Sequence, residues 1–259
     1  MELNFFFPFF ALILGLCLGS FYNVCIHRYL TVQSIVLPAS HCPLCGRAIA
    51  WRDNIPLFSY FLLKGRCRSC GQPISPMYPL VEAVSGILAV LLAFKFGPSL
   101  AWTVYMFFTG LLIIAAFIDF KIYILPDQIT LPGGVLALAA AFILPVYWVD
   151  AFLGALLGAG FFLLLQKSYK KIKKIEGLGT GDVKLMVMLG ALVGLQGLPI
   201  LIFSAALLGL LASLFYMKKS TGSSMHTPIP FGPFLALGAM IYILGGDIIW
   251  MWYLSSPAG

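Results

Sequence analysis

Two aspartates stand at the edges of long apolar segments, where their chemistry would suit hydrolysis. Asp119 ends the apolar segment 100–118, and Asp182 opens the segment 182–195. A carboxylate in or beside a bilayer is costly, at roughly 2.5–3.5 kcal/mol on insertion scales, and by default it marks function. Two carboxylates that share a proton can divide the work, one activating water as a base and the other protonating a carbonyl. We therefore predict that Asp119 and Asp182 form a hydrolytic pair.

The residues near Asp182 suggest how a substrate would reach it. Gly179 and Gly181 lack side chains, so an extended peptide could approach the carboxylate closely. Lys184 follows two positions later and is grouped with the supporting residues. Asp127 comes directly after a proline at the start of an apolar segment, which suits either a helix N-cap or a supporting part in the site. Both interpretations of Asp127 stay open.

Helix ends predict different roles for the two aspartates. Asp182 would lie at a helix N-terminus, where the macrodipole favours the ionised carboxylate, and Asp119 at a C-terminus, where it favours the protonated form. We expect Asp182 to be the base and Asp119 the acid, although a coupled pair titrates jointly.

Two Cys-x-x-Cys pairs, with 21 residues between them, form a second chemical motif. Its members are Cys42, Cys45, Cys67 and Cys70. Four thiolates close a tetrahedral shell around zinc, and Gly46 and Gly71 permit the tight turn after each pair. The alternative is disulfide exchange, which a reducing cytosol disfavours. We predict a structural zinc site with no open position for catalysis. Glu82, about one turn into the following apolar segment, faces the insert and is a further supporting candidate.

Composition places most of the chain in a membrane. Of 259 residues, 61% are hydrophobic and 10% are charged, whereas soluble domains carry about 25% charged residues. We predict an all-α polytopic membrane protein with about eight transmembrane helices and a zinc-ribbon-like insert between the first two. Seven spans with one re-entrant segment is the alternative. The apolar segments are 5–25, 77–96, 100–118, 129–148, 151–166, 182–195, 197–217 and 230–253.

Charge fixes the expected orientation of these spans. With the N-terminus outside, fifteen of the sixteen Lys and Arg residues fall on the inner side, and Lys95 alone falls outside. Both termini then face outside, and the long loops are cytosolic. The domains expected are a first span at 1–27, the insert at 28–76 and a seven-span domain at 77–259. The net charge of +7 serves topology and contact with acidic lipids, and no pattern indicates nucleic-acid binding.

Other functional classes fit less well. The N-terminus has an acidic residue and no Lys or Arg, so it does not resemble a cleaved secretory signal. An ion-coupled transporter would place its carboxylates near the bilayer midplane, whereas Asp119 and Asp182 are expected at its rim. A scaffold that uses the cysteine insert for docking is the remaining alternative to an enzyme.

An ordered set of motifs gives the chain a family resemblance. They are GSFYNV at 19–24 with HR at 27–28, the two Cys-x-x-Cys pairs, NIPLFSY at 54–60, YPLVE at 78–82, ID at 118–119 through LPD at 125–127, GTGD at 179–182 and TPIPFGP at 227–233. Over nearly its whole length the chain resembles the bacterial prepilin peptidases, also called type IV leader peptidases, of the GxGD class.

The resemblance implies an activity as well as a fold. Members cut the basic leader from type IV prepilins and type II secretion pseudopilins at the cytosolic face of the inner membrane, usually before phenylalanine. Many then methylate the new N-terminus with S-adenosylmethionine, and the cysteine insert matches that of bifunctional members. The catalytic aspartates correspond to Asp119 and Asp182. The binding residues for the methyl donor and the oligomeric state are not indicated.

Overall fold

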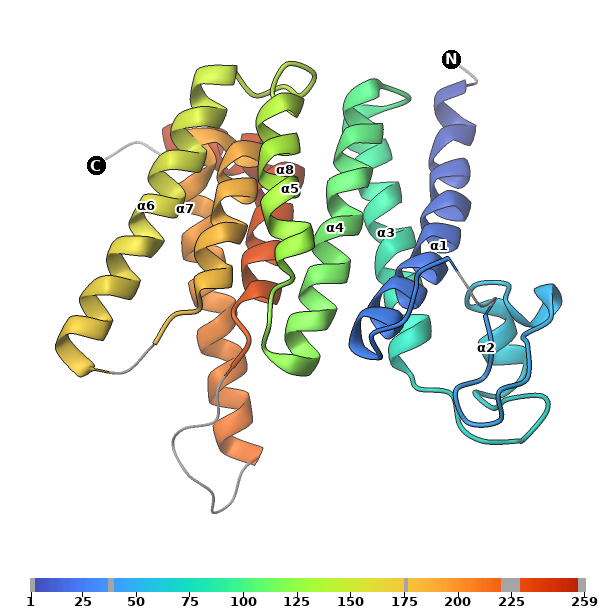
Figure 1. The fold of residues 1–259 in the computed structure, drawn as a ribbon. Helices are drawn as coiled ribbons and strands as arrows, with labels where there is room; N and C mark the ends of the chain where they lie inside the picture. The colour runs from blue at the N-terminus through green and yellow to red at the C-terminus, as the bar shows by residue number, and fades with distance from the viewer. Residues whose placement is uncertain (1–2, 37–39, 175–176, 220–228, 256–259) are drawn as a thin grey trace. The chain divides into compact units, whose positions relative to one another are not determined.

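The computed structural model describes residues 3–36, 40–174, 177–219 and 229–255 as helices joined by loops (Figure 1). Within these ranges there is no strand, and two isolated antiparallel bridges lie in the cysteine insert. Thr227 and Pro228 of the last motif fall outside the described ranges. The elements are α1 (Leu3–Leu30), η1 (Trp51–Asp53), α2 (Phe58–Leu62), α3 (Met77–Phe96), α4 (Leu100–Ile122), α5 (Asp127–Ala140), α6 (Trp148–Lys173), α7 (Thr180–Lys219) and α8 (Gly232–Ser255).

Six of the described helices are long and apolar enough to cross a membrane: α1, α3, α4, α6, α7 and α8. The prediction of a helical membrane protein with an insert between its first two long helices is confirmed. The count of eight spans stays a prediction. Helix α5 has 14 residues, short of the about 20 that a perpendicular span needs. Helix α7 contains two of the expected segments, 182–195 and 197–217. The helical backbone is broken between them at Gly194, where φ is 69° and ψ is 179°.

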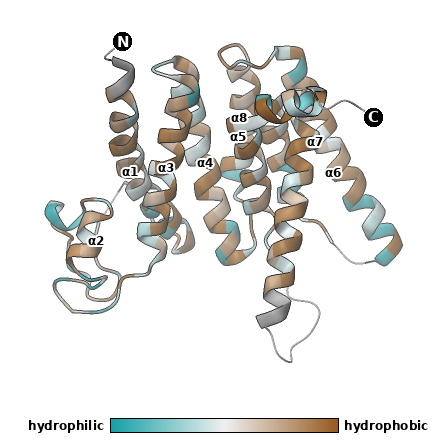
Figure 2. Cartoon of the chain, turned by 180° about the vertical axis from the view of Figure 1, so that it is seen from behind, coloured by the Kyte–Doolittle hydropathy of each residue, from teal (hydrophilic) through white to brown (hydrophobic). Residues whose placement is uncertain are grey.

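Apolar side chains cover the outside of the long helices, as a bilayer requires. Phe94 is 72% exposed and Phe203 is 70% exposed, and Figure 2 shows hydrophobic residues along most of each long helix. Hydrophilic residues gather in the insert and near helix ends (Figure 2). A soluble protein would not expose so many large apolar side chains, so the chain is an integral membrane protein.

The chain forms two compact units, Met1–Ile114 and Ala115–Gly259. In the N-terminal unit, α1 packs against α3 through glycines. A Cβ atom on Gly15 would lie 2.6 Å from Ala89 Cβ, and one on Gly19 would lie 2.7 Å from Glu82 Cα. The two backbones therefore touch, which is the usual way for apolar helices to associate in lipid. Phe7 and Trp102 bring the start of α4 against α1, with ring centroids 4.8 Å apart.

The C-terminal unit is built around α7, which packs against α5, α6 and α8. Gly154 of α6 and Gly190 of α7 lie backbone to backbone, with no room for a Cβ on either residue. A Cβ on Gly238 of α8 would lie 2.5 Å from the Leu201 carbonyl oxygen. The first contact packs the half of α7 that begins near Asp182 against α6, and the second packs the half beyond Gly194 against α8.

Candidate functional site

Asp119 lies near the end of α4 and is 5% exposed. Its Oδ2 accepts a hydrogen bond of 3.0 Å from the backbone N–H of Gly232, the first residue of α8. The helix ends shortly after, because Tyr123 takes a left-handed conformation and its N–H bonds back to the Asp119 carbonyl at 2.8 Å. A helix end and a helix start thus meet at one carboxylate.

Asp182 is the third residue of α7 and is 8% exposed. Its carboxylate accepts a hydrogen bond from the backbone N–H of Gly179. A Cβ on Gly179 would lie 3.2 Å from Asp182 Oδ2, so the loop before the helix folds closely over the carboxylate. The absence of a side chain at Gly179 is therefore required by the protein's own backbone, in addition to any need of a substrate.

Leu125 brings the surroundings of the two aspartates together. A Cβ on Gly181 would lie 2.9 Å from Leu125 Cβ, and a Cβ on Gly232 would lie 2.9 Å from Leu125 Cδ2. One leucine thus contacts both the residue before Asp182 and the residue bonded to Asp119, and the two carboxylates interact electrostatically. The structure places the two predicted residues in one buried site of the C-terminal unit.

The contact between Asp119 and Gly232 was not predicted from the sequence, which placed Asp119 only at the C-terminus of its own helix. The first N–H of α8 has no acceptor within its own helix and donates to Asp119 instead. Asp119 therefore also lies at a helix N-terminus. The predicted assignment of Asp182 as base and Asp119 as acid loses its electrostatic basis and stays a prediction. Pro233, next to Gly232, is the sequence signal that could have located this helix start, because proline favours the first turn of a helix.

Asp127 is not the N-cap of α5, contrary to one of the two interpretations of its sequence position. Pro126 is the N-cap residue, with φ −66° and ψ 125°, and Asp127 is the first helical residue. The carboxylate turns away from the helix end to Lys184, whose Nζ lies 2.7 Å and 2.8 Å from its two oxygens. A charged ammonium is a stronger partner than a backbone N–H, which explains the preference. The pair ties the start of α5 to α7, two residues after Asp182.

The four predicted cysteine ligands gather in the N-terminal unit. The Sγ atoms of Cys42, Cys45, Cys67 and Cys70 all lie within 4.8 Å of one another. The Sγ atoms of Cys42 and Cys70 are 3.9 Å apart, too far for a disulfide bond. A zinc tetrahedron with Zn–S bonds of about 2.3 Å has S–S edges of about 3.8 Å. The donor set and its spacing therefore fit a metal ion.

The two cysteine pairs have the same local backbone. Cys42 N–H bonds to the Arg47 carbonyl at 2.9 Å, and Cys67 N–H bonds to the Gln72 carbonyl at 2.9 Å. Each turn ends in a glycine of positive φ, Gly46 at 68° and Gly71 at 71°. The backbone N–H groups of Cys70 and Ser69 lower the pKa of the Cys67 thiol to about 7, since they stabilise its thiolate. The Gln72 backbone N–H would lower the pKa of the Cys70 thiol, but desolvation and hydrogen bonds with the other three cysteines outweigh it and raise this pKa to about 11, so the thiols of the cluster share their protons unevenly.

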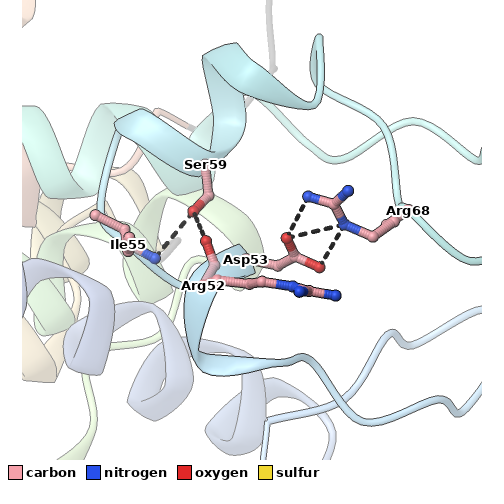
Figure 3. A network of polar contacts seen from close by, with 5 residues as sticks. All are labelled: Arg52, Asp53, Ile55, Ser59 and Arg68. Carbon is pink, nitrogen blue, oxygen red and sulfur yellow. Dashed lines mark hydrogen bonds and ion pairs between the residues drawn. The ribbon is translucent and has the colours of Figure 1, made fainter.

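A polar network supports the insert beside the cysteines (Figure 3). Arg68 donates through Nε and Nη2 to Asp53, with Nη2 2.7 Å from Oδ1 and Nε 2.9 Å from Oδ2. These hydrogen bonds lower the pKa of the Asp53 carboxyl below its ordinary value. The Ser59 hydroxyl donates to the Arg52 carbonyl at 2.9 Å and accepts from the Ile55 N–H at 3.0 Å. The network joins η1, α2 and the second cysteine pair.

Glu82 contacts the insert, as predicted. It lies in the second turn of α3, is 9% exposed, and accepts the Leu57 N–H at 2.8 Å. Glu82 belongs to the N-terminal unit, whereas the aspartate pair belongs to the C-terminal unit.

Comparisons with known proteins agree with this division. Residues 13–96 match the Bacterial Peptidase A24 N-terminal domain, and residues 106–214 match the Type IV leader peptidase family. No solved structure matches the chain.

The curated relatives match nearly end to end. The chain is 36% identical to a prepilin leader peptidase/N-methyltransferase of Aeromonas salmonicida, covering 93% of this chain and 92% of the relative. It is 36% identical to the one of Pseudomonas putida, over 93% and 91%, and 34% identical to the one of Neisseria gonorrhoeae, over 95% and 94%. With this similarity along its whole length, and with two buried aspartates in one site, the chain belongs to the type IV leader peptidase family.

Proposed function

We propose that this protein is an aspartic endopeptidase that removes the leader of type IV prepilins and type II secretion pseudopilins, and that it then N-methylates the new N-terminal residue. Membership of the type IV leader peptidase family supports both steps, since the relatives are named for both activities. The observation that carries the first step is the buried pair Asp119 and Asp182, in which each carboxylate accepts one backbone N–H.

Asp119 and Asp182 together supply the acid and the base for peptide hydrolysis. Two neighbouring carboxylates in a buried site hold one proton between them, because two adjacent negative charges are unfavourable. The ionised member removes a proton from water as the water oxygen attacks the scissile carbonyl, and the protonated member donates to the carbonyl oxygen. The tetrahedral intermediate then collapses as a carboxyl proton passes to the leaving amine. The N–H groups of Gly179 and Gly232 orient the carboxylates throughout.

Lys184 and Asp127 support this pair from the side. Their ion pair joins the first turns of α7 and α5, so it limits the movement of Asp182 relative to Leu125 and the loop before α5. Gly179 lets the loop before α7 fold over the Asp182 carboxylate, and Gly181 leaves room for the Leu125 side chain beside it. These roles are positional, since the charges of Lys184 and Asp127 are already matched to each other.

The four cysteines hold one structural zinc ion. Four thiolates fill a tetrahedral shell, so the metal stabilises the insert and takes no part in the reaction. S-adenosylmethionine is the methyl donor and acts as a second substrate. The insert at 28–76 is assigned to methylation, the segment 1–27 to the first span, and 77–259 to the membrane domain with the peptidase site.

The protein resides in the bacterial inner membrane with both termini in the periplasm. The distribution of Lys and Arg supports this orientation, which leaves the insert and the ends of α4 and α7 that carry the aspartates on the cytosolic side. A basic leader would be repelled by a basic surface, so acidic lipids aid the reaction by neutralising it. Comparing cleavage in neutral and anionic lipid tests this point, and equal rates would reject it.

Incubation of the purified protein in detergent with a prepilin, followed by mass spectrometry, tests the main proposal. We expect loss of a leader-sized mass, followed by gain of one methyl group when S-adenosylmethionine is added. Asp119→Asn and Asp182→Asn should each abolish cleavage while the protein stays folded. A folded wild-type protein that cleaves no prepilin would favour a transporter or a scaffold instead.

A further inference from the structure

Three of the sequence motifs meet at one place in the N-terminal unit, and the aspartate pair uses none of them. GSFYNV contributes Ser20 and Asn23 from α1, NIPLFSY contributes Leu57 from the insert, and YPLVE contributes Tyr78 and Glu82 from α3. We call these five residues the polar junction. Each makes a polar contact with another member, so segments far apart in the sequence form a single cluster.

Glu82 is a buried carboxylate that lacks a cationic partner. Its contacts are the N–H of Leu57, 2.8 Å from Oε2, and the hydroxyl of Ser20. In the described part of the chain, no Lys, Arg or His makes an ion pair with it. A buried charge without an opposite charge is unfavourable, so the site is suited to receive a cationic group.

Asn23 adds an acceptor that is still free. The residue is 3% exposed, and its Nδ2 donates to the Tyr78 carbonyl at 2.9 Å, which fixes the orientation of the amide. Its Oδ1 is buried and has no hydrogen-bond partner among the described residues. Unsatisfied buried polar atoms are rare in native structures, so this oxygen indicates a missing donor.

The backbone of Leu57 is held in an unfavourable conformation at the same place. Its φ of 59° and ψ of −50° lie near the γ-turn region, which is strained for a residue with a side chain. The hydrogen bond to Glu82 holds this turn. Strain of this kind collects at binding and active sites, where the surrounding structure imposes it.

The helix contact places the residues that carry the two acceptors about one helical turn apart. Ser20 and Asn23 are one turn apart on α1, and Tyr78 and Glu82 are one turn apart on α3. A Cβ on Gly19 would lie 2.7 Å from Glu82 Cα, so the helices touch at this level. Asn23 bonds to the carbonyl of Tyr78, one turn before Glu82. Both acceptors therefore border the same short stretch of the α1–α3 contact.

We propose that the polar junction binds the primary ammonium group at the N-terminus of the cleaved substrate and presents it for methylation. This inference rests on the proposed function. An ammonium group has three N–H donors and a positive charge, which match the Glu82 carboxylate and the free Asn23 oxygen. The ligand class is thus a peptide with an unblocked N-terminal amine.

The methyl transfer balances with groups of this kind. The ammonium gives one proton to the Glu82 carboxylate and becomes a neutral amine. The nitrogen lone pair attacks the methyl carbon of the sulfonium donor, a C–N bond forms, and the C–S electron pair stays on sulfur as a thioether. The product is an N-methylammonium, and Glu82 returns its proton to water. Glu82 binds and orients the amine, and Asn23 completes its hydrogen bonding.

Glu82→Gln is the decisive variant, because glutamine keeps an acceptor for the Leu57 N–H and removes the charge. Methylation is measured on a synthetic, already cleaved peptide, and cleavage is measured separately on a prepilin. We expect a rise in KM for the peptide amine and a loss in kcat/KM for methylation of roughly tenfold or more, with cleavage within about twofold of wild type. The KM for S-adenosylmethionine should not change.

Two further comparisons sharpen the test. Asn23→Ala removes the free amide oxygen and leaves the Glu82 charge in place. It should also lower methylation with little change in cleavage. Asp53→Asn removes a carboxylate of the same unit that is paired with Arg68, so it controls for a loosened insert and should methylate like wild type. In wild type, a des-amino analogue of the peptide should compete with substrate much more weakly than the peptide with a free amine. In Glu82→Gln, the two peptides should compete equally weakly.

Each remaining outcome would overturn the proposal. A selective rise in KM for S-adenosylmethionine would mean that the junction binds the sulfonium donor. Parallel loss of cleavage, methylation and bound zinc in both junction variants would mean that it only docks the insert. Unchanged methylation in both would remove any role. If wild-type protein neither cleaves nor methylates, the proposed function itself has failed, and this result is distinct from all the others.

Discussion

The Asp119 carboxylate and the Gly232 backbone N–H are 3.0 Å apart, although 113 positions separate them in the chain. This bond joins the last turn of α4 to the first residue of α8. It also leaves no room for a side chain, because a Cβ on Gly232 would lie 2.7 Å from Asp119 Oδ2 and 2.9 Å from Leu125 Cδ2. The position of one catalytic candidate thus depends on a glycine far along the chain.

Gly232→Ala should reduce prepilin cleavage by about 10²-fold, because the added methyl group displaces the Asp119 carboxylate from its place in the pair. The protein should stay folded, since alanine is a better helix former than glycine. Gly245→Ala, in the same helix, is the matched control: its Cβ would meet nothing within 4 Å. Cleavage rates of the two variants, measured on the same prepilin, check this. Equal activity would show that Asp119 does not need the Gly232 contact.

Removing the Asp127–Lys184 ion pair should have a modest effect. The side chains are 58% and 35% exposed, so the pair stabilises the fold by only about 0.2–1 kcal/mol. Asp127→Asn and Lys184→Gln should each lower cleavage less than tenfold, and the double variant should be no worse than either single one, because both lose the same contact. Additive losses in this double-mutant cycle would instead assign Lys184 a separate contact with substrate.

Metal analysis should find one zinc ion per chain. Cys45→Ser should lower the zinc content and loosen residues 40–74, measured by hydrogen exchange, while the exchange of α5 to α8 stays as in wild type. The reason is that a four-thiolate site supplies much of the folding free energy of so small a module. Wild-type protein that contains no metal, or that contains Cys–Cys disulfides when purified under reducing conditions, would contradict the prediction.

Acid should weaken the insert through Asp53. Arg68 lowers the pKa of the folded Asp53 carboxyl below its ordinary 3.8, so the pair contributes stability above that value and loses it as the pH falls through the lowered pKa. The insert of wild type should therefore exchange its amides more slowly than that of Asp53→Asn at pH 6, and the difference should shrink as the pH falls below 3.8 through the lowered pKa. Comparing both proteins at each pH removes the common effect of cysteine protonation. A constant difference over this range would exclude a part for Asp53.

Local sequence patterns predicted the parts of this protein that local chemistry determines. Apolar length predicted the long helices, and cysteine spacing predicted the four-thiolate cluster, since each signal lies within a short stretch of chain. The contact of Asp119 with Gly232 could not be foreseen in this way, because it depends on how α8 returns to the end of α4. Asp127 shows the same limit, since the sequence before it suits an N-cap and the cation that it binds comes 57 residues later.

Because of the break at Gly194, side-chain directions in the second half of α7 do not follow from those in the first half by helical periodicity alone. In a continuous helix each inserted residue turns everything beyond it by about 100°, because there are 3.6 residues per turn. The backbone of Gly194, with φ 69° and ψ 179°, lies in a region open essentially to glycine alone and interrupts this transmission. The direction in which each side chain from 195 to 215 faces is therefore set by the Gly194 backbone as well as by its distance along the helix from Asp182.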